Sequence, residues 1–307
     1  MTDLQRDVTF ASFLFPQASA GRGLLEQAVA TEALGYDLIG VPDHFDWPHY
    51  ADQWTLLSAI VGRTERIEVF SCVSSLALRQ PPAVLAKAAW SIDVIAPGRF
   101  HLGLGTGALP GIVTIDGPQW APGESVERLR EAIELIRLFW SGAEEVSYDG
   151  RYYRLAQAKL PTAPSSPIGI WLGVVKPRML ALTGRVADGW IPGMFSIDPE
   201  LVRDDTERVD EAILAAGREL RDVRRVYNTI AKKLQPKSDG FLIGPAAQWV
   251  EQLTVAVLEL GFDTIVIGDR EAPLAHLHTI AEEVIPAVRE NVERERRGAT
   301  VEAGVIA

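Results

Sequence analysis

Residues 99–107 read Arg-Phe-His-Leu-Gly-Leu-Gly-Thr-Gly, an apolar strand that runs directly into a loop of small residues. Three glycines alternate along this stretch, so a ligand can approach the backbone closely, and Thr106 adds a hydroxyl beside available N–H groups. The pattern fits either an anion-binding loop or close packing of a strand against a helix. It is not the dinucleotide-binding fingerprint, because the glycine spacing differs and the stretch lies well inside the chain. The position of this stretch relative to the other predicted strands therefore decides between an anion-binding loop and a packing site.

An apolar, β-branched run followed by a segment of helical period recurs about eight times along the chain. The predicted strands are 8–15, 37–41, 67–73, 100–104, 168–173, 189–192, 223–230 and 264–268. A helix is expected after each of them; in 124–140 the apolar residues recur at steps of three and four, and Gly142 ends the segment. Repeated strand–helix units imply right-handed parallel crossovers, and eight of them close into a barrel. We therefore predict an α/β fold, a (β/α)8 TIM barrel, with one domain over residues 1–307.

Two segments interrupt the regular alternation. Residues 142–167 contain no barrel unit, and the turn Asp149-Gly150 predicts a small hairpin inserted there, after the fourth helix. Residues 232–244 are polar, so we expect a mobile loop above the seventh strand. Chemistry in such barrels lies at the carboxyl ends of the strands, so the loops at these ends hold the candidate site.

The composition excludes several classes of protein. The chain has 307 residues and no Gly/Ser-rich or Pro-rich linker, which favours a single domain. A net charge of −11 argues against general affinity for nucleic acid or an anionic membrane and favours a small-molecule substrate. Cys72 is the single cysteine, which excludes an intramolecular disulfide and a thiolate metal cluster within one chain. Residues 1–6 lack a signal pattern and no apolar run approaches transmembrane length, so we expect a soluble, cytoplasmic protein.

The loop after the second predicted strand carries the strongest candidate for chemistry. Here His44 follows Asp43, and a histidine beside a carboxylate at a strand's carboxyl end can serve as a general acid or base. The alternative is a histidine that caps the loop beside two core aromatics, Phe45 and Trp47. The predicted position of this loop at the carboxyl end of a barrel strand favours the catalytic interpretation. We predict His44 as the acid or base, Asp43 as the residue that orients it, and Trp47, with Phe45, as a wall of the substrate side.

Two further loops carry weaker signals. Residues 72–76, Cys-Val-Ser-Ser-Leu, either end the third strand or form a bulge that supports a flat ring. Pro177 suits the first turn of the helix after the fifth strand, whose N–H groups and dipole bind an anion, helped by Lys176 and Arg178. Together with residues 105–107, this loop supplies two candidate phosphate contacts on one face of the barrel.

The remaining histidines predict no metal site. His276 and His278 are two residues apart in a predicted helix, where they point to different faces. His101 lies within a strand, which is typical of a structural histidine.

The combined motifs resemble the bacterial luciferase-like, flavin- or deazaflavin-dependent oxidoreductases over nearly the whole chain. Residues 98–107 resemble the fourth strand and cofactor loop of that family, 127–142 and 148–153 its next helix and hairpin, and 182–190 its sixth-strand signature. Residues 43–45, Asp-His-Phe, resemble a loop of the branch that uses coenzyme F420, an 8-hydroxy-5-deazaflavin. The resemblance implies a single luciferase-like barrel domain that forms a homodimer.

By this resemblance, the protein transfers a hydride between a small organic substrate and coenzyme F420. An FMN-dependent luciferase-like monooxygenase is the alternative, since such enzymes share most of these motifs, and a flavin-binding protein without chemistry is the second alternative. The resemblance further implies a non-proline cis peptide at Cys72–Val73 behind the ring, and phosphate contacts from residues 106–107 and 175–176. The predicted cofactor contacts are Asp43, Cys72, Val73, Ser74, Gly105, Thr106, Gly107, Val175, Lys176 and Pro177.

The chain departs from the sugar-phosphate dehydrogenases of this branch at two places. Ala108 follows the Gly-Thr-Gly loop where those enzymes carry an acidic residue, and Val175-Lys176 replaces paired glycines. The resemblance therefore does not specify the substrate. We expect residues 108–122 and 232–244 to shape its pocket.

Overall fold

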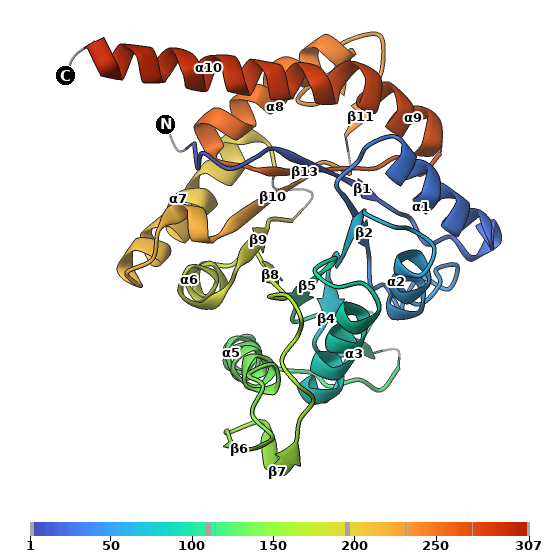
Figure 1. The fold of residues 1–307 in the computed structure, drawn as a ribbon, viewed down its shortest axis with the longest axis vertical. Coiled ribbons are helices and arrows are strands. Elements are labelled where there is room, and N and C mark those ends of the chain that lie inside the picture. Colours follow the sequence, from blue (N-terminus) through green and yellow to red (C-terminus); the bar gives the residue numbers. More distant parts are fainter. Residues whose placement is uncertain are drawn as a thin grey trace.

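Eight parallel strands form a closed barrel in the computed structural model, which describes residues 3–107, 112–113, 115–193, 197–230, 232–271 and 273–305. The strand order is β3-β2-β1-β13-β10-β9-β8-β5, and a direct pairing between β3 and β5 closes the circle. Helices surround the strands, and α10 runs across the top of Figure 1 beside α8. The predicted (β/α)8 barrel is confirmed.

All eight predicted strands are present, each within about two or three residues of its expected bounds. The barrel strands are β1 (Thr9–Phe13), β2 (Leu38–Val41), β3 (Glu68–Ser71), β5 (Phe100–Gly105), β8 (Ile170–Gly173), β9 (Gly189–Ile191), β10 (Arg224–Asn228) and β13 (Thr264–Ile267). The helices are α1 (Gly23–Ala33), α2 (Gln53–Val61), α3 (Pro82–Ile95), α5 (Pro122–Phe139), α6 (Pro177–Val186), α7 (Pro199–Ala215), α8 (Ala246–Leu260), α9 (Pro273–Thr279) and α10 (Ile285–Val305). Short elements are β4 (Ser74–Ser75), the 3-10 turns Ala18–Ala20 and Leu220–Asp222, and the π-helical turn Ile280–Val284 between α9 and α10.

Two hydrophobic layers hold the barrel together. Successive strand residues point to opposite faces, so alternate positions fill the barrel interior and the others pack beneath the helices. The interior cluster contains Ala11, Phe13, Leu38, Phe70, Trp171, Ile191, Val226 and Val266. A larger cluster joins the outer strand faces to the helices and includes Phe10, Ile39 and Val69. Both strand faces are therefore buried, which explains why the strands read as nearly continuous apolar runs.

The predicted hairpin is confirmed and extends away from the barrel beside α5 (Figure 1). It consists of β6 (Glu145–Asp149) paired antiparallel with β7 (Arg154–Lys159). The buried carboxylate of Glu131, on α5, accepts backbone N–H groups of residues 151–153 at 2.9 to 3.3 Å. One acidic side chain of the fourth helix thus fixes the hairpin turn.

The segment 232–244 contains regular structure that its composition did not predict. Residues Lys233–Leu234 (β11) and Ile243–Gly244 (β12) form a short parallel pair. The N–H of Leu242 donates to Gln252 on α8 at 2.7 Å, which ties the segment to the barrel. Its mobility stays a prediction.

Within the described residues, no helix combines the length and apolar character needed to cross a membrane. The same part of the chain holds no group of three or more histidine, cysteine, aspartate or glutamate side chains arranged for a metal ion.

Candidate active site

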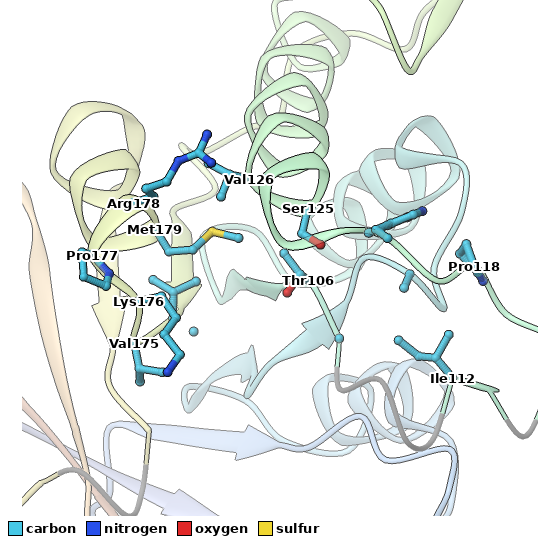
Figure 2. Close-up of a pocket in the computed structure, with 16 residues that line it drawn as sticks. Thr106, Ile112, Pro118, Ser125, Val126, Val175, Lys176, Pro177, Arg178 and Met179 are labelled. Carbon is cyan, nitrogen blue, oxygen red and sulfur yellow. The ribbon is translucent and has the colours of Figure 1, made fainter.

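Two adjoining cavities open at the carboxyl ends of the barrel strands. The first, which we call the histidine cavity, has a volume of about 330 Å³ and lies among the loops that follow β2, β3 and β5. The second, the helix-end cavity, has a volume of about 520 Å³ and lies between the loop after β5 and the first turns of α5 and α6 (Figure 2). Both are lined by Thr106, Gly107, Ile112 and Gly173. They therefore form one continuous cleft across the predicted face of the barrel.

Val73 lines the histidine cavity at the ends of the barrel strands. The peptide bond Cys72–Val73 is cis, as predicted. The Val73 side chain reaches across the barrel mouth to the ends of β5 and β8, and a Cβ added to Gly173 would lie 2.8 Å from its Cγ1. Glycine at position 173 is thus required by close approach, since any side chain there would displace Val73. That Val73 supports a ring stays a prediction.

Asp43 enters the histidine cavity as one member of a buried ion pair. Its side chain is 3 % exposed, and Arg79 donates from Nη2 to Oδ1 at 2.5 Å and from Nε to Oδ2 at 3.1 Å. The N–H of Ser75 also donates to Oδ2, at 3.0 Å. Burial lowers the pKa of Arg79, but the hydrogen bonds and charges of Asp43 and Asp52 outweigh it and raise this pKa above its usual value. Both oxygens of Asp43 are therefore held in place by Arg79.

His44 has a different carboxylate neighbour from the one predicted. Its Nδ1 lies 3.7 Å from Oδ1 of Asp46, and its side chain is 41 % exposed. The imidazole stacks on Trp47 with ring centroids 4.9 Å apart and planes at 22°. Asp43 pairs with Arg79, and Asp46 and Trp47 flank the histidine. That Asp43 orients His44 stays a prediction. His44 itself lines the cavity, as expected.

Trp47 supports His44 from outside the cavity. The lining of the histidine cavity includes Phe45 but not Trp47. Trp47 packs against Tyr50 with centroids 4.9 Å apart, and the guanidinium of Arg270 lies 4.9 Å from its ring. Arg270 also donates to the hydroxyl of Tyr50 at 3.2 Å. Arg270, from the segment after β13, therefore holds Trp47 and Tyr50 in place, which is a contact between distant parts of the chain.

The helix-end cavity gathers polar groups that suit an anion. Figure 2 shows Val175, Lys176 and Pro177 on one side and the hydroxyls of Thr106 and Ser125 on the other. Both α5 and α6 begin with proline in their first turn, and the first N–H groups of a helix lack partners within it. Two helix dipoles thus favour negative charge at this cavity. The sequence predicted the α6 contribution but missed α5 and Ser125; the proline that begins α5 was the available signal.

The two neighbouring serines after the cis bond point in opposite directions. Ser74 donates to Gln53 Oε1 at 2.6 Å and accepts from Trp54 Nε1 at 3.1 Å, so its hydroxyl faces α2. Ser75, which belongs to the same predicted loop but is not among the predicted cofactor contacts, lines the histidine cavity. Of the predicted contacts, the histidine cavity brings together Asp43, Cys72, Val73, Gly105, Thr106 and Gly107, and the helix-end cavity Thr106, Gly107, Val175, Lys176 and Pro177. Their contact with a cofactor stays a prediction, and Ala108 lies outside the described residues.

Three other histidines, His101, His276 and His278, line neither cavity. His101 places Nε2 at 2.7 Å from Glu68 and stacks on Trp171 inside the barrel, in a structural role. His276 is buried, whereas His278 pairs with Glu282 at 3.1 Å.

The model of the luciferase-like monooxygenase family matches residues 8–231. The chain belongs to this family. Among curated relatives, an F420-dependent glucose-6-phosphate dehydrogenase of Microbacterium testaceum is 35 % identical over 208 residues, covering 65 % of this chain and 61 % of the relative. That of Amycolatopsis mediterranei is 33 % identical over 228 residues, covering 71 % and 66 %. The chain thus spans less than two thirds of the length of these relatives.

Solved structures of other proteins share the fold of this chain. An F420-dependent secondary alcohol dehydrogenase with an F420-acetone adduct has a TM-score of 0.81 at 19 % identity, covering 92 % of this chain and 99 % of that one. A long-chain alkane monooxygenase has a TM-score of 0.75 at 14 % identity, with coverage of 96 % and 92 %. At such identities, these similarities establish the fold alone.

Proposed function

We propose that this protein is an oxidoreductase that moves a hydride between a small organic substrate and coenzyme F420. The observation that carries the proposal is the continuous cleft, which runs from His44 and Val73 to two helix N-termini and Lys176. The sequence relatives add support, since they are named F420-dependent glucose-6-phosphate dehydrogenases.

The residues of the cleft fit a flat ring that carries a phosphate. Val73 and the side-chain-free strand end at Gly173 offer an apolar floor against which a ring would lie. Thr106, Ser125 and Lys176 would hold the phosphate at the ends of α5 and α6, where the helix dipoles favour negative charge. When bound, the deazaflavin supplies a carrier that gives or takes one hydride.

His44 is the residue we assign to proton transfer. Because Nδ1 faces Asp46, Nε2 is the ring atom left to exchange a proton with the substrate. An alcohol substrate that loses a hydride from its carbon must also lose the proton of its hydroxyl group, and the reverse reaction returns both. The adjacent Phe45 is 61 % exposed and would pack on an apolar part of the substrate.

The FMN-dependent monooxygenases remain the second candidate, because a phosphate site between helix N-termini suits FMN equally well. A protein that binds a flavin without chemistry is the third. Titrating the pure protein with F420 and with FMN, followed by fluorescence, separates the first two. We expect tight binding of F420 and none of FMN, and the opposite result refutes the proposal. Binding of F420 without turnover over a broad substrate panel would favour the third candidate.

We also propose a cytoplasmic homodimer that binds no nucleic acid. The net charge of −11 opposes contact with a polyanion. Val84, Val94 and Ile95, on the outer side of α3, are 57 to 60 % exposed, and apolar residues of this kind are commonly covered by a second subunit. Light scattering should give about twice the chain mass of 33.6 kDa. A monomer at micromolar concentration would contradict the dimer.

A further inference from the structure

The imidazole of His44 is held by aromatic rings and not by hydrogen bonds from the described residues. Its side chain is 41 % exposed, and the carboxylate of Asp46 lies 3.7 Å from Nδ1, which is beyond hydrogen-bond distance. Two rings pack on it: Trp47 stacks with centroids 4.9 Å apart and planes at 22°, and Tyr50 makes an edge contact at 6.4 Å. The direction of the imidazole therefore depends on where these two rings lie.

The guanidinium of Arg270 holds both of these rings. It lies 4.9 Å from the centre of the Trp47 ring, within the range of a cation–π contact. It also donates from Nη2 to the hydroxyl of Tyr50 at 3.2 Å. The two rings touch each other as well, with centroids 4.9 Å apart. Because Arg270 lies over one ring and bonds to the other, it fixes the positions of both.

The barrel topology brings Arg270 to the loop of His44 from a distant part of the chain. In the sheet, β1 lies between β2 and β13, so the loops that follow these three strands are neighbours. Arg270 follows β13, and its guanidinium lies 5.3 Å from the ring of Phe15, which follows β1. The backbone around Arg270 forms a turn in which Asp269 accepts the N–H of Glu271 at 2.7 Å. Arg270 thus reaches the loop of His44 from a braced position.

The charge of Arg270 is not used in an ion pair with the described residues. Its side chain is exposed, and its contacts are with three aromatic residues, Phe15, Trp47 and Tyr50. By contrast, Arg79 bonds to a carboxylate. A guanidinium that packs only on rings is suited to hold those rings in place.

We propose that Arg270 is a positioning residue for His44: it holds Trp47 and Tyr50 in place and so keeps the imidazole directed into the cleft for proton transfer. The inference rests on the proposed function, in which His44 exchanges a proton with the substrate. Proton transfer needs the two heavy atoms within hydrogen-bond reach, so a small rotation of the imidazole slows it. Arg270 acts through the two rings and does not itself touch the substrate.

Arg270→Met tests the inference, because methionine keeps an unbranched apolar chain and removes the charge and the donor. We expect kcat at saturating F420 to fall about tenfold, with the Kd for F420 and the KM for the substrate within about twofold of wild type. Arg270→Lys keeps a cation for the Trp47 ring and should restore kcat to within about threefold of wild type. A raised KM with unchanged kcat would show that Arg270 binds the substrate instead, and would overturn the inference.

Arg289→Met is the matched control. The guanidinium of Arg289 also lies over an aromatic ring, 5.6 Å from that of Phe10, and it bonds to Asp37 at 2.7 Å, but Arg289 lines neither cavity. Its loss should lower the melting temperature and leave kcat unchanged. An equal loss of kcat in both variants would show a general effect on the fold and overturn the inference.

A double substitution tests whether Arg270 acts through His44. In a His44→Ala background, Arg270→Met should lower kcat by less than about twofold, because the group that it positions is already gone. A loss of about tenfold in both backgrounds would refute the positioning role.

The NMR signals of the His44 ring protons report the stack without any turnover. The ring of Trp47 shifts these signals, and the chain has only 5 histidines, so His44→Ala assigns them. They should move in Arg270→Met and return towards their wild-type positions in Arg270→Lys. Unchanged signals in Arg270→Met would overturn the inference.

The remaining outcomes separate this inference from the proposed function. If His44→Ala loses turnover but Arg270→Met keeps kcat within about twofold of wild type, the inference alone is overturned. If His44→Ala keeps wild-type turnover, the proton-transfer role of His44 and the inference both fall. If wild type binds only FMN, the proposed cofactor is wrong, and the same variants assayed with FMN decide the role of Arg270. If wild type binds neither cofactor, the proposed function and the inference both fall.

Discussion

Replacing His44 by alanine separates a catalytic histidine from one that only fills a loop. The structure gives His44 few stabilising contacts: a stack on Trp47, an edge contact with Tyr50 at 6.4 Å between ring centroids, and a half-exposed approach of 3.7 Å to Asp46. An aromatic stack contributes about 0.5–1.5 kcal/mol, and an exposed ion pair contributes little. We therefore expect the free energy of unfolding to fall by about 1 kcal/mol. In a domain of this size, that lowers the melting temperature by about 3 °C or less.

Turnover should respond on a different scale. If His44 exchanges the proton that accompanies hydride transfer, its loss should reduce kcat about 100-fold to 10,000-fold at saturating cofactor, with the cofactor Kd unchanged. His278→Ala is the matched control, since that imidazole is also half-exposed and paired with a carboxylate, at 3.1 Å from Glu282, but lines neither cavity. It should keep wild-type turnover.

The assay is steady-state turnover followed by F420 absorbance, together with thermal melting of each variant. A folded, cofactor-saturated His44→Ala protein with turnover within about threefold of wild type would remove His44 from the catalytic residues. A collapse of stability instead of turnover would show that the loop depends on the histidine for packing.

Three further predictions concern the surrounding network. Arg79→Met leaves the carboxylate of Asp43 buried without its partner and should reduce the free energy of unfolding by about 3 kcal/mol in denaturant titrations; a loss below about 1 kcal/mol would show that the pair is solvated. Burial raises the pKa of Glu68, but the hydrogen bond and charge of His101 outweigh it, and the net pKa lies below 4.5. A carboxylate with a lowered pKa stabilises the folded state at pH values above its unfolded-state pKa, and this stabilisation is lost as the pH falls through the folded-state pKa. Glu68→Gln should therefore make the free energy of unfolding decline less steeply below about pH 4.5. An unchanged slope would contradict this. Lys176→Met should weaken binding of F420 about tenfold but leave binding of its phosphate-free deazaflavin core unaffected, whereas equal weakening of both would exclude a phosphate contact.

The barrel and the general location of its site could be predicted from local patterns. Strands in a parallel barrel are buried on both faces, so they appear in the sequence as short continuous apolar runs. The surrounding helices are buried on one face, so their apolar residues recur at steps of three and four. The carboxyl end of every strand then identifies the loops that share one face, which is how residues 43–47, 72–74, 105–107 and 175–177 were selected. Each of these four loops contributes to the lining of the cleft.

The partners within those loops could not be predicted in the same way. Asp43 and His44 are adjacent in sequence, which suggested that one orients the other, yet Asp43 bonds to Arg79 and His44 lies beside Asp46. Ser74 resembled Ser75 in every local respect, but only Ser75 faces the cavity.

By itself, the sequence determined the eightfold strand–helix repeat, the inserted hairpin and the family, because each depends on short-range periodicity or on motifs that stay together along the chain. Only the tertiary structure decided that Arg79 joins Asp43 to Asp52, that Arg270 braces Trp47, and that the start of α5 faces that of α6 across the helix-end cavity. The physical reason is that a side chain's direction and its partner depend on how separate loops approach one another after the barrel closes. Hydrogen bonds and ion pairs act over a few ångströms in space, and the distance between two residues along the chain does not encode that separation.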